Sequence, residues 1–248
     1  MVNLPKELQQ KNFYDVMQKM ISISGWSILE KNNLLALKSG ANIPLINFVW
    51  GDVTIKNINI IKSFYQQHSF TWLLMPNQND ELLISAGFSG PEPSPEMVLY
   101  LDKYRFEEYE SNMQVKVATS NEELDLWAQV ASETFGISAF ELKEFFEPLI
   151  KVAGAIPFLI YYDNIPATTS LVYCYDQVAG IYAMSTRENF RRKGLGGAAV
   201  QACLKEAKNN NISYAVLYAS QMGKPLYESM GFQVSQVLEE YVFEINGE

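Results

Sequence analysis

The sequence predicts a layered fold of the α+β or α/β class, in which mixed strands and helices share one core. Three observations support this prediction. Strand and helix patterns follow one another in the second half of the chain, a glycine-rich turn there joins a strand to a helix, and a weak internal repeat relates the two halves. The chain of 248 residues is long enough for one large domain or two small ones.

The second half of the chain carries the clearest elements. An alternating strand over 114–118 precedes a helix that Thr119 or Ser120 can cap, with two glutamates in its first turn. A second helix over 139–146 is expected to stop near Pro148. The elements that follow are three strands over 157–162, 167–175 and 178–185 joined by tight Asp-Asn and Asp-Gln turns, a helix over 198–209, a strand over 214–219, a helix over 225–230 and a last strand over 239–244.

A weak internal repeat extends the prediction to the first half. Three segments recur in the second half at one separation of 144 residues: 72–75 with 216–219, 86–88 with 230–232, and 97–101 with 241–245. A constant separation over three elements indicates duplication of one supersecondary unit, although apolar strands are also easily matched by chance. At this separation, residues 191–195 correspond to 47–51, which hold no basic cluster and a single glycine. The first copy is therefore expected to be a degenerate structural partner.

These observations divide the chain into a degenerate N-terminal domain over 1–110 and a functional domain over 111–248. The charged segment 104–112 is the expected linker. The Pro-rich segment 89–95 is interpreted as a loop inside the first half.

Composition narrows the function classes. The formal net charge of −9 disfavours nucleic-acid binding, because phosphate neutralisation needs an excess of clustered base. Cys174 and Cys203 lie far apart and the single histidine is His68, so a His/Cys zinc site and a Ser-His-Asp triad are both poorly supported. The N-terminal residues are polar and no apolar stretch reaches membrane length. We expect a cytoplasmic protein with free thiols and with no metal, nucleic-acid or membrane partner; its oligomeric state stays open.

A basic, glycine-rich turn is the most informative motif. Within seven residues of an otherwise acidic chain stand Arg187, Arg191, Arg192 and Lys193, and Gly194-Leu195-Gly196-Gly197 follows directly. Glycines let backbone N–H groups approach an anion, and a helix N-terminus adds partial positive charge. A strand, a turn and a helix in this order indicate a pyrophosphate-bearing, nucleotide-like ligand. The alternative is a solvated turn that binds nothing.

Two motifs, with the expected elements between them, resemble those of a known family. Residues 191–196, Arg-Arg-Lys-Gly-Leu-Gly, are similar to the Q/R-x-x-G-x-G/A acyl-CoA loop of the GNAT superfamily of acetyl-CoA-dependent N-acetyltransferases. Residues 226–232, Leu-Tyr-Glu-Ser-Met-Gly-Phe, are similar to its late L-Y-E-x-x-G-F segment. The resemblance covers roughly Val115 to the C-terminus. It implies a mixed, mostly antiparallel sheet flanked by helices, preceded here by a second, degenerate GNAT-like domain.

The resemblance implies a cofactor site for acetyl-CoA. Backbone N–H groups of 192–197 would bind the pyrophosphate, and the basic side chains would neutralise it or the ribose phosphate. The preceding strand separates from its neighbour in this family, and a backbone N–H near Met184 would hold the thioester carbonyl. Ser220 stands where the family often has an Asn that contacts the cofactor. The cofactor-binding residues implied in this way are Met184, Ser185, Thr186, Arg191, Arg192, Lys193, Gly194, Leu195, Gly196, Gly197 and Ser220.

Tyr227 matches the tyrosine that protonates the departing CoA thiolate in many family members. A phenol suits this task because its pKa is comparable to that of a thiol. The alternative role for Tyr227 is a packed aromatic side chain on a short helix. The general base is open: Glu133, Tyr182 and Asp176 are candidates, and Glu188 is disfavoured because it lies close to the loop.

The main functional hypothesis is transfer of an acetyl group from acetyl-CoA to a primary amine by direct attack in a ternary complex. The alternative is a non-catalytic acyl-CoA-binding or regulatory module whose N-terminal half recognises a partner. A P-loop enzyme is disfavoured because the loop lacks the Gly-Lys-Ser/Thr ending. The sequence does not specify the acyl chain, or whether the amine belongs to a small molecule or a peptide.

Overall fold

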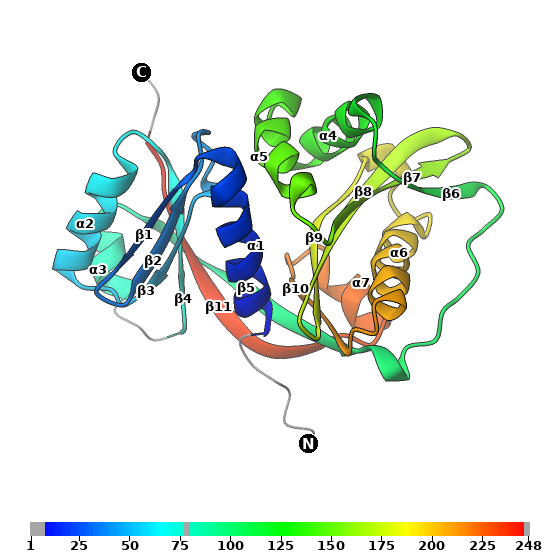
Figure 1. Ribbon diagram of the computed structural model, residues 1–248. Helices are drawn as coiled ribbons and strands as arrows, with labels where there is room; N and C mark the ends of the chain where they lie inside the picture. Colours follow the sequence, from blue (N-terminus) through cyan, green and yellow to red (C-terminus); the bar gives the residue numbers. More distant parts are fainter. Residues whose placement is uncertain (1–7, 77–79, 246–248) are drawn as a thin grey trace. The chain divides into compact units, whose positions relative to one another are not determined.

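The computed structural model describes residues 8–76 and 80–245 (Figure 1). These residues form two compact units. Unit 1 comprises residues 8–19 and 96–235, and unit 2 comprises the other described residues. No helix in the described part of the chain is long and apolar enough to cross a membrane.

Unit 1 is a mixed sheet with helices on its faces. Its elements in chain order are the first part of α1 (Leu8–Ser24), the end of β5 (Ser89–Tyr100), β6 (Met113–Val117), α4 (Asn121–Phe135), α5 (Ala139–Lys151), β7 (Ala155–Tyr162), β8 (Ile165–Tyr175), β9 (Val178–Thr186), α6 (Leu195–Asn209), β10 (Tyr214–Tyr218), α7 (Lys224–Ser229) and the start of β11 (Gln233–Phe243). Its strands lie in the order β5-β10-β9-β8-β7-β6. Only β9 and β10 among these neighbours are parallel, so the predicted mostly antiparallel mixed sheet is confirmed.

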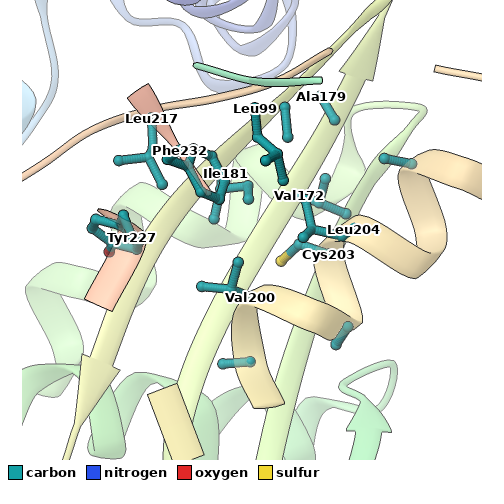
Figure 2. Close-up of a cluster of buried hydrophobic side chains, with 14 of the residues drawn as sticks. Leu99, Val172, Ala179, Ile181, Val200, Cys203, Leu204, Leu217, Tyr227 and Phe232 are labelled. Atoms are coloured by element: carbon teal, nitrogen blue, oxygen red, sulfur yellow. The ribbon is translucent and has the colours of Figure 1, made fainter. Parts of the chain in front are cut away.

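Alternation of side chains along the strands separates the two faces of this sheet. Ala179 and Ile181 of β9 pack with α6 in one hydrophobic core, which Figure 2 shows together with Tyr227 of α7. Val178, one residue before Ala179, belongs instead to a second cluster, against which Leu8 of α1 packs. Because consecutive strand residues point to opposite faces, α6 and the first part of α1 cover opposite faces of the sheet.

Helices α4 and α5 begin as predicted, but α5 ends later than predicted. The Ser120 hydroxyl accepts the N–H of Glu123, whose carboxylate completes a capping box at the start of α4. α5 runs through Pro148 to Lys151, beyond the predicted end at 146. The proline removes only one backbone donor near the helix end, and Leu149 keeps the last turn buried against the core.

Unit 2 repeats the same arrangement with fewer residues. It contains β1 (Ser27–Lys31), β2 (Leu34–Lys38), β3 (Phe48–Gly51), α2 (Ile55–Tyr65), β4 (Phe70–Leu74), α3 (Asp80–Ser85), the start of β5 and most of β11. Its strands lie in the order β1-β2-β3-β4-β11, and only β3 and β4 are parallel. Aromatic rings fill its core, where Tyr65 and Phe70 stack with their centroids 4.3 Å apart.

The structure confirms the internal repeat. Adding 144 to the bounds of β4 and α3 gives the bounds of β10 and α7, and the equivalent glycines Gly87 and Gly231 share left-handed φ angles of 90° and 92°. In unit 1 the end of β5 pairs with β10, and in unit 2 the end of β11 pairs with β4. Each unit therefore takes the last strand of the other repeat. For this reason the compact units do not coincide with 1–110 and 111–248; that division stays a prediction about the duplicated halves.

The prediction of a loop over 89–95 was wrong, because these residues begin the 12-residue strand β5. Pro91, Pro93 and Pro95 alternate along the strand, so the missing N–H groups all lie on one of its edges. The other edge keeps its donors, and the φ angle of proline is compatible with extended backbone.

Candidate functional site

The glycine-rich turn leaves the start of α6 open to an anion. Gly194 is the residue before the helix, has a φ of 75° and offers no side chain to cap it. Counting from the start of the helix, the first backbone N–H that forms a hydrogen bond is that of Ala198, which donates to Gly194 O at 3.1 Å. The N–H groups of residues 195–197 precede it and point along the helix axis, where the helix dipole adds positive charge. The helix begins at Leu195, three residues earlier than predicted, so these N–H groups belong to its first turn.

Two further glycines keep this helix start accessible. A side chain at Gly196 would approach Leu226 of α7, whose Cδ2 lies 2.9 Å from the position of a Cβ. At Gly197 a Cβ would meet nothing within 4 Å, so this face of the first turn is open. The absence of side chains lets α7 pack close to α6 while the backbone stays reachable.

The equivalent helix of unit 2 is closed by its own side chains. Thr54 caps α2 by accepting the N–H of Asn57 at 3.1 Å. The Asn57 side chain then donates to Asp52 O at 2.9 Å. These polar groups occupy the place that an anion would take, and Asp52 adds a negative charge beside it. Unit 2 thus lacks the open helix start of unit 1.

The basic cluster divides into anchored and exposed side chains. Arg187 forms an ion pair with Glu133 at 2.8 Å and donates to Pro166 O, so it ties β9 to α4. Arg191 Nε donates to Thr186 O at 3.3 Å, within the turn. Arg192 is exposed, and its own backbone takes a left-handed φ of 62°.

Lys193, next along the turn, is also exposed. Its Nζ lies 4.6 Å from the ring centroid of Tyr162. Arg192 and Lys193 are therefore the cations of the turn that solvent reaches most freely.

β9 and β10 pair over only three residues each and then separate. The paired residues are Val178–Gly180 with Tyr214–Val216, while β9 continues to Thr186. We call the region past Gly180 and Val216 the strand opening. A bulge lies there, because Ala183 has a φ of 51° and the register with β8 shifts. The separation of this strand from its neighbour, expected from the motif, is present.

The side chains predicted along the cofactor arm are engaged elsewhere. The Ser185 hydroxyl lies 2.6 Å from that of Thr169, and the Thr186 hydroxyl accepts a hydrogen bond from Thr168 at 3.1 Å. Met184 packs against the core shared with α6. In this stretch only backbone groups of β9 are left for a ligand in the strand opening.

Tyr227 lies on α7 within the core that α6 covers (Figure 2). Only 6% of it is exposed, and its ring packs against Phe232 with the centroids 5.9 Å apart. Burial raises the pKa of the Tyr227 phenol well above its usual value, and the nearby Cys203 thiol adds a smaller effect. Within residues 8–76 and 80–245 its hydroxyl has no hydrogen-bond partner. The phenol is thus held protonated with its donor unused.

Ser220 precedes α7 and helps to shape its start. Its hydroxyl oxygen accepts the N–H of Gly223 at 3.1 Å. A Cβ at Gly223 would lie 2.9 Å from the Tyr227 ring, so glycine lets the turn pass close to that ring. Ser220 therefore acts on the Tyr227 neighbourhood through the turn, and its O–H proton is still available to a ligand.

A pocket of about 640 Å³ adjoins the glycine-rich turn. Gly194, Gly197 and Ser229 form one side of it, and segment 103–110 forms the other. That segment is fixed to α6, because the Glu107 N–H donates to Gln201 Oε1 at 2.9 Å. The volume is in the range of small-molecule sites.

Two of the three candidate bases are engaged by other side chains, and the third lies at the end of β9 opposite the strand opening. Glu133 is paired with Arg187. Asp176 is exposed at the tip of the β8–β9 hairpin, with a φ of 52°. Tyr182 donates its hydroxyl proton to Asn12 Oδ1 at 2.6 Å, and burial raises its pKa well above the usual value.

The disfavoured Glu188 opens a short 3₁₀ turn, Glu188–Phe190, and its carbonyl accepts the N–H of Arg191. Its exposed side chain stands within the loop itself. The turn, the strand opening and Tyr227 all belong to unit 1, and in the described part of the chain neither candidate carboxylate, Glu133 or Asp176, stands unpaired beside Tyr227.

One polar cluster of unit 1 was missed by the sequence prediction. Asn12 and Asp15 of α1 face β8 and β9, where Asp15 accepts the hydroxyl proton of Tyr173. Lys19 bridges the same pair, 2.8 Å from Asp15 and 2.6 Å from the Tyr173 hydroxyl. This cluster could have been found from the sequence, because Asn12, Asp15 and Lys19 stand three and four residues apart among apolar residues. Such spacing indicates a helix whose buried face is partly polar.

Comparisons with known proteins agree with this geometry. Residues 120–232 match the model of the acetyltransferase (GNAT) family. No curated protein matches the chain.

Among solved structures, a GCN5-related N-acetyltransferase from Kribbella flavida has a TM-score of 0.72 at 15% identity, with 98% of both chains covered. A tandem GNAT protein from the clavulanic acid biosynthesis pathway has a TM-score of 0.58 at 10% identity, covering 98% of this chain and 97% of its own. A functionally unknown protein from Staphylococcus epidermidis has a TM-score of 0.66 at 12% identity, covering 89% of this chain and 95% of its own. At these identities the likeness shows the fold, and it extends over both units.

Proposed function

From the premise that residues 120–232 form a domain of the GNAT acetyltransferase family, we propose that this protein transfers an acetyl group from acetyl-CoA to a primary amine. The observation that carries the proposal is the open start of α6 beside the strand opening, both in unit 1. The first offers unpaired N–H groups to a pyrophosphate, and the second offers a free strand edge to an extended amide-bearing chain.

Each part of acetyl-CoA has a proposed place. The pyrophosphate binds the N–H groups of residues 195–197, and Arg192 and Lys193 supply counter-charge. The adenosine end occupies the pocket beside Gly197 and Ser229. The pantetheine arm runs along the backbone of β9 past Gly180, so that the thioester reaches the bulge at Ala183.

The proposed reaction is a direct transfer. The amine nitrogen attacks the thioester carbonyl carbon, a C–N bond forms, the C–S bond breaks, and the CoA thiolate takes the proton of the Tyr227 hydroxyl. The amine releases its own proton to water, and Tyr227 is reprotonated from solvent. Burial raises the pKa of Tyr227, so the phenol holds the proton that it donates to the thiolate.

A non-catalytic acyl-CoA-binding module is the second candidate. The observation that favours it is the engagement of all three candidate bases in other contacts or at the far hairpin tip. The two candidates share the cofactor site and differ in turnover.

Two measurements test the proposal in sequence. Calorimetry with acetyl-CoA should show binding that Arg192→Ala weakens by roughly three- to tenfold, since an exposed cation contributes modestly to phosphate binding. Release of CoA is then followed with a panel of primary amines, with Tyr227→Phe as the matched variant. Binding with turnover that falls in Tyr227→Phe supports the enzyme. Binding without turnover supports the second candidate, and no binding by the native protein refutes both.

A further inference from the structure

Asn12 of α1 makes contacts on both sides of the point where β9 leaves β10. Its Nδ2 donates to Tyr173 O and to Val178 O, each at 3.1 Å. Its Oδ1 accepts the hydroxyl proton of Tyr182 at 2.6 Å. Val178 still pairs with β10, whereas Tyr182 lies past the last paired residue, Gly180. One side chain, only 1% exposed, thus joins the paired and the separated parts of β9.

Gly180 makes this contact possible. A Cβ there would overlap Asn12 Oδ1 and lie 2.6 Å from the Tyr182 hydroxyl oxygen. The amide of Asn12 and the phenol of Tyr182 therefore rest directly on the β9 backbone at the last residue that pairs with β10. All the hydrogen-bonding groups of the Asn12 side chain are used, so its position is fixed by three partners at once.

Tyr182 and Tyr218 occupy equivalent places on the two separating strands. Each lies two residues past its last paired position, Gly180 on β9 and Val216 on β10. Both side chains point to the face that α1 covers, because alternation places them with Val178 and Val216. The two side chains lie close together: burial is the main cause of the raised pKa of Tyr182, and the charge interaction with Tyr218 is the second cause. The two phenols thus line the α1 side of the strand opening.

We propose that Asn12 is a positioning residue for acyl-CoA: by holding Tyr182 over Gly180 it fixes the strand opening that receives the pantetheine arm. The inference rests on the proposed function and deepens it. Asn12 lies outside the family-matched residues 120–232, so the N-terminal helix completes the cofactor site of unit 1. Asn12 and Tyr182 act on the arm of the cofactor and not on its phosphates, which bind at the start of α6.

Two ligands separate these effects: acetyl-CoA, which has the arm, and 3′-phospho-ADP, which has only the nucleotide end. Calorimetry is done on the full chain with Asn12→Ala, with Tyr182→Phe and with the double variant. Each single variant should weaken acetyl-CoA binding by roughly tenfold, because each breaks the buried hydrogen bond between Asn12 and Tyr182. The double variant should be no weaker than the worse single variant, because both changes break the same contact. Binding of 3′-phospho-ADP should stay within about twofold of native.

Tyr173→Phe is the matched control. It removes a tyrosine hydroxyl that also contacts α1, but this hydroxyl does so through Asp15 and Lys19 and not through Asn12. Its acetyl-CoA affinity should equal that of the native protein. Because Tyr182→Phe keeps the aromatic ring in place, it also guards against a folding defect in Asn12→Ala.

Three results would overturn the inference. Equal weakening of both ligands would show that the contact supports the whole fold, and unchanged acetyl-CoA affinity would show that it supports nothing in the site. A loss in Tyr173→Phe as large as that in Tyr182→Phe would assign the effect to α1 packing in general. A native protein that binds neither ligand would refute the proposed function itself, a result distinct from these three.

Discussion

Replacing Gly197 with glutamate should stabilise the protein and abolish cofactor binding at the same time. Gly197 is the third residue of α6, and a Cβ there would meet nothing within 4 Å, so the substitution introduces no clash. Glycine inside a helix costs about 1 kcal/mol relative to alanine, and glutamate recovers about half of that. A carboxylate in the first turn adds about 0.3–1 kcal/mol through the helix dipole. We therefore expect Gly197→Glu to be about 1 kcal/mol more stable, with a Tm about 2–4 °C higher.

The same carboxylate would repel the pyrophosphate. Two unit charges about 5 Å apart at an effective dielectric constant near 20 repel by about 3 kcal/mol, which corresponds to a loss of affinity of more than about 100-fold. Calorimetry with acetyl-CoA measures the affinity, and thermal unfolding measures the stability. Gly197→Gln is the matched control, because it has the same shape without the charge and should lose less than about tenfold.

The two effects have opposite signs, which makes the test specific. A Gly197→Glu variant that binds acetyl-CoA as tightly as Gly197→Gln would refute the assignment of the pyrophosphate to the start of α6. A variant that lost both stability and binding would show that the open space at Gly197 is not there.

Other consequences of the structure are independent of this one. Tyr227→Phe should lower kcat by about 100-fold and leave the acetyl-CoA Kd within about twofold, measured by CoA release and calorimetry; an unchanged kcat would remove Tyr227 from the reaction. Because its pKa is raised, ionisation of Tyr227 should cause no loss of kcat between about pH 7 and 10. Glu133→Gln breaks a half-exposed ion pair with Arg187 and should change kcat by less than about twofold, whereas a large loss would restore Glu133 as the base. Gly180→Ala should destabilise the fold by more than about 2 kcal/mol in thermal unfolding, while Gly40→Ala, whose Cβ would meet nothing within 4 Å, should cost less than about 0.5 kcal/mol. Burial raises the pKa of the Cys203 thiol to about 12 and that of Cys174 to about 11, so both should resist alkylation at pH 8 until the protein is unfolded.

The sequence predicted the parts of the site that depend on local chemistry. The turn around Gly194 could be found because a positive φ, an uncapped helix start and clustered base all leave a local signature. The repeat could be found because β4 and β10 share a hydrophobic pattern at a constant separation. Tyr227 could be placed because its motif follows the loop in a fixed order.

The sequence did not predict the parts that depend on distant contacts. Nothing local to Asn12 shows that its amide lies on Gly180, 168 residues later, or that Arg187 turns from the loop to Glu133. The alternation of apolar residues also could not predict that the repeats exchange their last strands. β5 and β11 have similar apolar patterns, so by pattern alone either strand could pair with β10. The prolines of β5 led to the wrong prediction of a loop, because prolines break most strands. Alternating prolines, however, remove backbone donors from one edge of a strand only.

We propose that one molecule of acetyl-CoA binds each chain, in unit 1. A crystal structure of the complex tests it most directly. We predict one cofactor per chain, with the pyrophosphate within hydrogen-bond distance of the N–H groups of residues 195–197 and the pantetheine arm against β9 past Gly180. A cofactor bound at the start of α2, or one whose pyrophosphate lies away from the start of α6, would contradict it.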